Sequence, residues 1–107
     1  MPIQRVTNQT IKVLSALLEI GEPVWGLELV RLTGLMTGTV YPILERLEEA
    51  NWLISNWEVQ NERSGPRRRL YELTGEGKIG ASELIESEQL KANKKVKNSI
   101  ASKPLEA

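Results

Sequence analysis

The segment from Leu35 to Glu49 places the tightest constraint on how this chain can fold. Its apolar residues recur at helical spacing, so a helix formed here has one face suited to a core. These residues are Val40, Ile43, Leu44 and Leu47. The other face carries small groups, hydroxyls and one cation, in Thr37, Gly38, Thr39, Tyr41, Pro42 and Arg46. Such a face near the start of a helix is typical of helices that enter a DNA groove.

Two further helices are predicted before this segment. Thr7 or Asn8 caps the first, which runs to about Ile20 and ends at a glycine. The second covers about residues 26–33 and is also closed by a glycine. Only about four residues then lead to Thr37, which we expect to cap the third helix. The short, glycine-containing connection between the second and third helices is helix-turn-helix spacing.

A β-hairpin is predicted after the third helix, which should end near an asparagine at position 51. Leu53, Trp57 and Val59 share one face of the first strand, a pattern typical of a half-buried strand. The return strand has Tyr71 and Leu73 on one face. Together these elements predict an α+β, mainly helical fold. It is a winged helix-turn-helix with three helices, a two-stranded β-hairpin wing and a long C-terminal helix.

Arginines gather at the tip of this hairpin, at Arg63, Arg67, Arg68 and Arg69. Consecutive strand residues point to opposite faces, so the last three cannot all serve one surface. We expect Arg67 with Arg69, or Arg63 with Arg67, to contact DNA phosphates or the minor groove. The remaining arginine is expected to pair with Glu58 or Glu72 across the hairpin. The hairpin tip is therefore a second candidate DNA contact.

The residue types that are missing exclude whole classes of function. The chain has no cysteine, histidine or aspartate, so the usual zinc and transition-metal ligands are absent, and we expect neither a metal nor a cofactor. Ser-His-Asp and Cys-His catalysis are excluded, which makes an enzyme improbable. No apolar run reaches the roughly 18 residues of a membrane span, and the N-terminus does not resemble a signal peptide. A cytoplasmic protein is expected.

The net charge, unlike the motifs, does not favour DNA binding. The 14 basic and 14 acidic residues cancel, whereas nucleic-acid-binding proteins are usually basic overall. The basic residues are clustered, however, at the hairpin tip and near the C-terminus. A local basic patch can bind phosphate while the remaining surface is acidic, and such binding should depend strongly on salt.

Three segments together resemble the PadR-like transcriptional regulators. Residues 17–29 are similar to the first block of that family, residues 37–48 to its recognition-helix motif, and residues 65–74 to its wing motif. The blocks occur in the family's order, and the Tyr-Pro pair at Tyr41 and Pro42 belongs to the family pattern. The resemblance implies a winged-helix regulator that is most often a dimeric repressor of double-stranded DNA operators.

The resemblance also implies how two chains would associate. Only about thirty residues follow the wing motif, as in the short subgroup, whose long C-terminal helix pairs with the first helix of a second chain. The expected interface is Ile11, Leu14 and Leu18 with Ile79, Leu84, Ile85 and Leu90. Some relatives bind a drug or phenolic acid in a larger C-terminal domain. Because this chain resembles the short subgroup, we do not expect a pocket for a bulky ligand. Whether a small-molecule effector exists is left open.

The expected organisation is a winged-helix domain at 1–75, a dimerisation helix at 76–100 and a flexible tail at 101–107. A two-fold dimer would separate two recognition helices by about 34 Å, one DNA turn, and would read a pseudo-palindromic operator. Two other functions fit the same residues. One is a winged helix that docks a partner protein, which the neutral net charge favours slightly, and the other is an architectural DNA factor for recombination.

Overall fold

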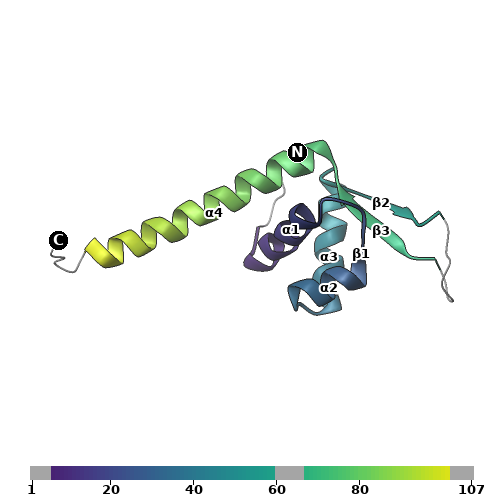
Figure 1. The fold of residues 1–107 in the computed structure, drawn as a ribbon, viewed down its shortest axis with the longest axis horizontal. Coiled ribbons are helices and arrows are strands. Elements are labelled where there is room, and N and C mark those ends of the chain that lie inside the picture. The colour runs from purple at the N-terminus through teal and green to yellow at the C-terminus, as the bar shows by residue number, and fades with distance from the viewer. Residues whose placement is uncertain (1–5, 60–66, 102–107) are drawn as a thin grey trace.

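Four helices and three short strands make up the fold of the computed structural model, which describes residues 6–59 and 67–101 (Figure 1). Their order is α1 (Asn8–Ile20), β1 (Val24–Trp25), α2 (Gly26–Thr33), α3 (Thr37–Glu49), β2 (Leu53–Trp57), β3 (Arg69–Leu73) and α4 (Gly75–Ala101). The mainly helical winged-helix prediction is confirmed. The predicted tail, apart from Ala101, lies outside the described residues.

The first two helices begin and end as their sequence predicts. The backbone N–H of Thr10 donates to the hydroxyl of Thr7 at 3.2 Å, so Thr7 is the N-cap of α1. Gly21 and Gly34, with φ of 69° and 74°, end α1 and α2 in the left-handed conformation that glycine adopts without steric cost. The cap at Gly34 begins the short turn between α2 and α3.

The apolar face of α3 lies at the centre of the core. Its four predicted residues, Val40, Ile43, Leu44 and Leu47, are all buried. Leucines and valines of α1 and α2 pack on them, together with residues from the base of the sheet, and these are Val13, Leu14, Leu17, Leu29, Leu53, Tyr71 and Leu73. Burying an aliphatic side chain of this size contributes about 1.5–3 kcal/mol to folding. The core therefore holds α3 by one face and leaves its other face outside.

The start of α3 differs from the prediction by one residue. Thr37 is the first residue of the helix, not its cap, and the N-cap is Met36. The carbonyl oxygen of Met36 accepts the N–H groups of Thr39 and Val40 at 2.9 and 3.0 Å, so the backbone closes this turn without a side-chain cap. Pro42 is consequently inside the helix, where it removes one backbone donor. Asn51, with φ of 65°, follows the helix in the left-handed conformation, as expected.

The sheet has one strand more than the predicted hairpin. β1 pairs with β3 on the side opposite β2, which gives the antiparallel order β1-β3-β2. This two-residue strand has no periodic pattern of its own and forms because β3 offers a free edge beside it. The prediction that Trp57 and Val59 are half-buried is wrong, because they are 54% and 89% exposed. α3 covers only the base of the hairpin, so the outer end of β2 has no core to face.

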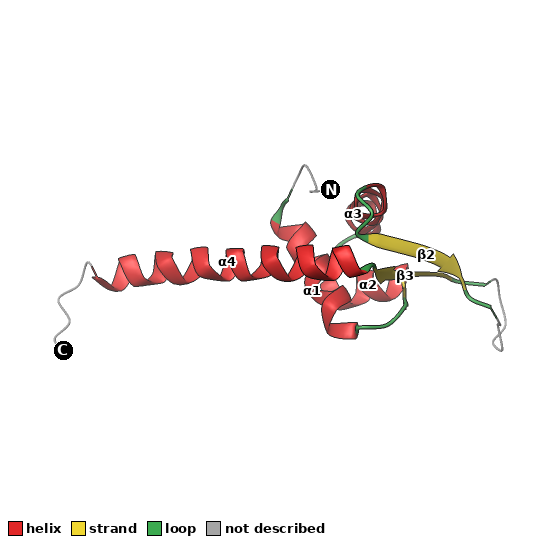
Figure 2. Ribbon diagram, turned by 90° about the horizontal axis from the view of Figure 1, so that it is seen from above, coloured by secondary structure: helices red, strands yellow, loops and turns green. Residues whose placement is uncertain are grey.

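α4 crosses the fold at its first turns and then extends away from it (Figures 1 and 2). The hydroxyl of Thr74 accepts the N–H of Gly77 at 2.9 Å and donates to the carbonyl of Asn51 at 2.7 Å, so Thr74 caps α4. Trp52 lies directly against Gly77 and Gly80, where any side chain would collide with it. The two glycines allow this helix to approach the end of α3 closely.

We predict that Gly77→Ala destabilises the fold by about 1–3 kcal/mol, the usual cost of overpacking a tight site. The added Cβ would meet the backbone carbonyl of Trp52, which cannot turn aside as a side chain could. Denaturant unfolding measures the change. Gly75→Ala is the matched control on the same helix, because a Cβ there meets open space. Equal stability of the two variants would contradict this account of the helix crossing.

Candidate nucleic-acid interface

The exposed face of α3 presents the groups that the sequence singled out. Thr37, Gly38, Pro42 and Arg46 are exposed, and Thr39 is partly exposed. The side chain of Arg46 forms no hydrogen bond or ion pair with the other described residues. An exposed guanidinium and hydroxyl groups near a helix start are suited to phosphate oxygens and to the edges of bases.

A small hollow of about 220 Å³ lies between the starts of α3 and α1. Arg46 lines it together with Thr39 and Pro42, and α1 contributes Thr7 and Gln9. No sequence pattern indicates that Gln9 belongs here, because it comes beside α3 only through the packing of α1 on α3. Its exposed amide is the kind of group that contacts a DNA backbone beside an arginine.

Tyr41 has a structural contact that the sequence did not predict. Its ring lies against Gly26 at the start of α2, where an added Cβ would be 2.6 Å from the tyrosine hydroxyl oxygen. The ring therefore fixes the approach of α2 to α3, although part of it stays exposed. Tyr41 belongs to the α3 surface, but much of its contact area is with α2.

One face of the hairpin is fastened to α3. The hydroxyl of Ser55 in β2 donates to the carboxylate of Glu48 in α3 at 2.8 Å. Tyr71 and Arg69 share this face of the sheet, because they are opposite Ser55 and Trp57 in the strand register. The guanidinium of Arg69 lies 5.3 Å from the centre of the Trp57 ring. Arg69 thus points to the side of the sheet that faces α3.

The other arginines of the wing are placed differently. Arg67 is exposed at the end of the described hairpin, while Arg63 lies outside the described residues. Arg68 points to the opposite face, and its guanidinium stacks on the ring of Trp25 at 3.6 Å. The Glu58 carboxylate accepts the backbone N–H of Arg68 at 2.8 Å, a contact that the sequence did not predict.

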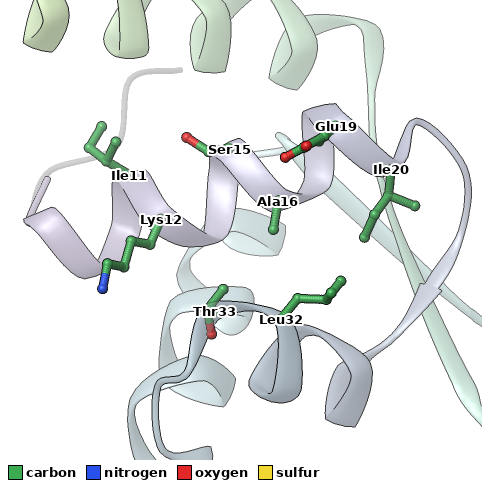
Figure 3. A pocket seen from close by; sticks show the side chains of 8 residues that line it. All are labelled: Ile11, Lys12, Ser15, Ala16, Glu19, Ile20, Leu32 and Thr33. Atoms are coloured by element: carbon green, nitrogen blue, oxygen red, sulfur yellow. The ribbon is translucent and has the colours of Figure 1, made fainter.

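A larger groove, of about 520 Å³, lies between α1 and α2 (Figure 3). Apolar side chains form most of it, with polar groups at its edge, and these residues are Ile11, Lys12, Ser15, Ala16, Glu19, Ile20, Leu32 and Thr33. None of them belongs to α3 or to the hairpin. The groove is therefore separate from the candidate DNA-binding surface.

Metal and membrane sites were also sought in the described part of the chain. Residues 6–59 and 67–101 contain no cluster of acidic side chains that could hold a metal ion. Across the same residues, no helix combines the length and the apolar character needed to cross a membrane.

Comparisons with known proteins identify the family. A profile described as the transcriptional regulator PadR-like family matches residues 13–83. The chain therefore belongs to the PadR-like family of transcriptional regulators, whose members are not enzymes. A comparison with curated protein sequences gives no match.

Solved structures agree with this assignment. A PadR family transcription regulator from Clostridium difficile R20291 is 30% identical, with a TM-score of 0.67, over 89% of this chain and 99% of that one. A PadR-like transcription factor from Bacteroides fragilis is 28% identical, with a TM-score of 0.64, over 83% and 86%. NadR in complex with 4-hydroxyphenylacetate is 25% identical, with a TM-score of 0.65, over 85% of this chain and 62% of that one.

We predict that Tyr71 makes folding stability fall with rising pH in the alkaline range. Burial, and then the negative charge of Glu48, raise the pKa of Tyr71 above its ordinary value. The folded state therefore holds this proton more tightly than the unfolded state, so stability is lost as pH rises above about 10, the ordinary tyrosine pKa.

Tyr71→Phe removes this one ionisation. Denaturant unfolding at about pH 8 and about pH 11 should show that the variant loses less stability between the two conditions than the unmodified protein does. Lysines titrate in the same range in both proteins and cancel in the comparison. An equal loss in both proteins would show that Tyr71 ionises as freely in the fold as in the unfolded chain.

Proposed function

We propose that this PadR-like regulator is a cytoplasmic repressor that binds double-stranded operator DNA as a homodimer. α3 occupies the major groove, and the hairpin wing lies on the flanking backbone or minor groove. The observation that carries the proposal is the exposed Arg46 side chain on α3, which has no partner among the described residues, next to a hairpin that carries Arg67 and Arg69. Two cationic groups on adjoining elements suit the spaced phosphates of a duplex.

Specific roles follow from the exposure of each group. Arg46 contacts a guanine edge or a phosphate, and the hydroxyls of Thr37 and Thr39 contact phosphates, with Gly38 and Pro42 allowing close approach of the backbone. Tyr41 contributes only its exposed edge. In the wing, Arg67 and Arg69 contact phosphates or the minor groove.

The proposed dimer rests on α4. Ile79 and Leu90 are 64% and 61% exposed, which is a large apolar area for one helix to leave in water. Leu84 and Ile85 are partly buried against the core on the opposite side of α4, and Ile11 and Leu18 of α1 are also partly buried, so these four would contribute only their exposed parts. Leu14 is removed from the interface expected from the sequence, because it is fully buried within its own chain. Residues 1–75 then form the DNA-binding unit and 76–100 the dimerisation helix.

An effector is an optional part of this proposal. The NadR structure, which shares this fold, holds 4-hydroxyphenylacetate. In this chain the groove between α1 and α2 has the volume of a small-ligand site. A small-molecule effector is therefore compatible with the proposed repressor but is not needed for DNA binding.

In vitro selection from a random duplex library at physiological salt tests the proposal. Enrichment of a two-fold-related site with half-sites about one turn apart would support a dimeric, sequence-reading regulator. Binding that is cooperative, bends DNA and prefers no sequence would support an architectural role in recombination instead. If folded protein enriches no duplex, the DNA-binding proposal fails and a protein partner becomes the better explanation.

We predict that Arg46→Ala lowers affinity for the selected operator by about 1–3 kcal/mol if the guanidinium contacts a base edge. Discrimination at one base position should weaken with it. Lys78→Ala, which removes an equal charge from the exposed surface of α4, is the control and should bind like the unmodified protein. Affinity that is unchanged by Arg46→Ala would remove this residue from the interface.

We predict a different result for Arg67→Ala. A lost phosphate contact weakens binding to all duplexes alike and reduces the slope of log affinity against log salt by about one. Fluorescence titrations of an operator and a scrambled duplex at several salt concentrations measure both effects. A loss confined to the operator would instead make Arg67 a base-reading residue.

A further inference from the structure

The stack of Arg68 on Trp25 joins the wing to the helix-turn-helix. Trp25 ends β1 and is also the N-cap of α2. It pairs with Leu70 in the strand register, so its side chain lies on the same face of the sheet as that of Arg68, which precedes Leu70 by two residues and is just outside β3. With the guanidinium carbon 3.6 Å from the ring centre, the planar cation lies flat on the indole. This geometry is favourable for a cation–π contact.

The backbone of Arg68 is held as firmly as its side chain. Its N–H donates to the Glu58 carboxylate at 2.8 Å, and its carbonyl accepts the Glu58 N–H at 2.9 Å. These two hydrogen bonds are at the outer end of the β2–β3 pair. Arg68 therefore makes two kinds of contact. Its backbone is hydrogen-bonded to Glu58, directly after β2, and its side chain stacks on Trp25 at the start of α2.

The surroundings of Arg68 are poorly suited to binding a phosphate. One face of its guanidinium is covered by the indole, and its Nε is buried with no hydrogen-bond partner among the described residues. Glu28, in the first turn of α2, is near enough for the charge of Arg68 to act on it. The Arg31 guanidinium lowers the pKa of Glu28 most, and the charge of Arg68 lowers it further.

The direction of the side chain leads to the same conclusion. Arg69 lies on the sheet face that is bonded to α3 through Ser55 and Glu48, whereas Arg68 lies on the opposite face. A cation placed at the start of a helix is also electrostatically unfavourable, because that end carries the positive part of the helix dipole. At this position the stacking of Arg68 on Trp25 has to outweigh the unfavourable interaction with the helix dipole.

We propose that Arg68 is a positioning residue of the wing and not a DNA contact. By stacking on Trp25 it holds the hairpin at a fixed angle to the helix-turn-helix, so that Arg67 and Arg69 reach the duplex that α3 reads. This inference rests on the proposed DNA-binding function, and it gives Arg68 a role other than a contact with DNA. Lysine can replace Arg68 only in part, because its ammonium can lie over the indole but lacks the planar face that stacks flat on it.

Two substitutions test the inference in DNA binding. Arg68→Lys should lower operator affinity several-fold, while the slope of log affinity against log salt stays unchanged, because no phosphate contact is lost. Trp25→Leu should have the same effect, and the double variant should be no weaker than either single one, as for two residues that act through one contact. Arg31→Lys is the matched control, and it should keep full affinity because Arg31 is exposed on α2, pairs with Glu28, and has no proposed DNA contact.

A second readout needs no DNA. Amide hydrogen exchange in the free protein should be about five- to thirtyfold faster in β3 of Arg68→Lys, because a lost stack lets the hairpin open more often, and unchanged in Arg31→Lys. Thermal unfolding confirms that each variant is folded before the comparison is made.

The outcomes separate this inference from the proposed function. If the unmodified protein binds no duplex, the DNA-binding function fails, while faster exchange in Arg68→Lys would still support the fastening role. If Arg68→Ala reduces the salt slope by about one, or if Arg68→Lys leaves both affinity and exchange unchanged, the positioning role is overturned. A double variant whose losses add would likewise show that Trp25 and Arg68 act separately.

Discussion

The burial of the apolar face of α3 is the interaction on which the remaining elements depend. Val40, Ile43, Leu44 and Leu47 form a surface that α1, α2 and the base of the hairpin all contact. Because this one face supplies the contacts for every neighbour, the opposite face needs no packing partner and is free to carry polar and charged groups. A polar group such as Arg46 costs little when it stays in water. The division of α3 into a buried apolar face and an exposed polar face therefore follows from one helical repeat.

Much of this arrangement could be predicted because the relevant signals are local. The 3.6-residue period of α3, the Thr7 and Thr74 caps and the glycines after α1 and α2 act within a few residues of chain, so the sequence displays them directly. The start of α3 was misplaced by one residue because the Met36 backbone closes that turn, and a backbone contact has no sequence signature.

What could not be predicted depends on contacts between distant segments. β1 exists only because β3 presents an edge to it, and Trp57 is exposed because α3 ends before it could cover that part of the sheet. The different environments of the neighbouring Arg68 and Arg69 also depend on distant segments. Strand alternation shows that Arg68 and Arg69 point to opposite faces of the sheet. It does not show that the Trp25 ring lies on one of those faces. Gln9 beside Arg46 was hidden for the same reason.

The contact between Trp52 and the two glycines of α4 has a consequence for regulation. Trp52 directly follows α3, and its ring and backbone fill the space that side chains at Gly77 and Gly80 would occupy. α4 therefore cannot tilt at this crossing without displacing the end of α3. In a dimer held together by α4, the distance between the two reading helices would be set at this crossing, inside each chain. Anything that changes the angle between the two long helices would change which operator spacing the protein accepts.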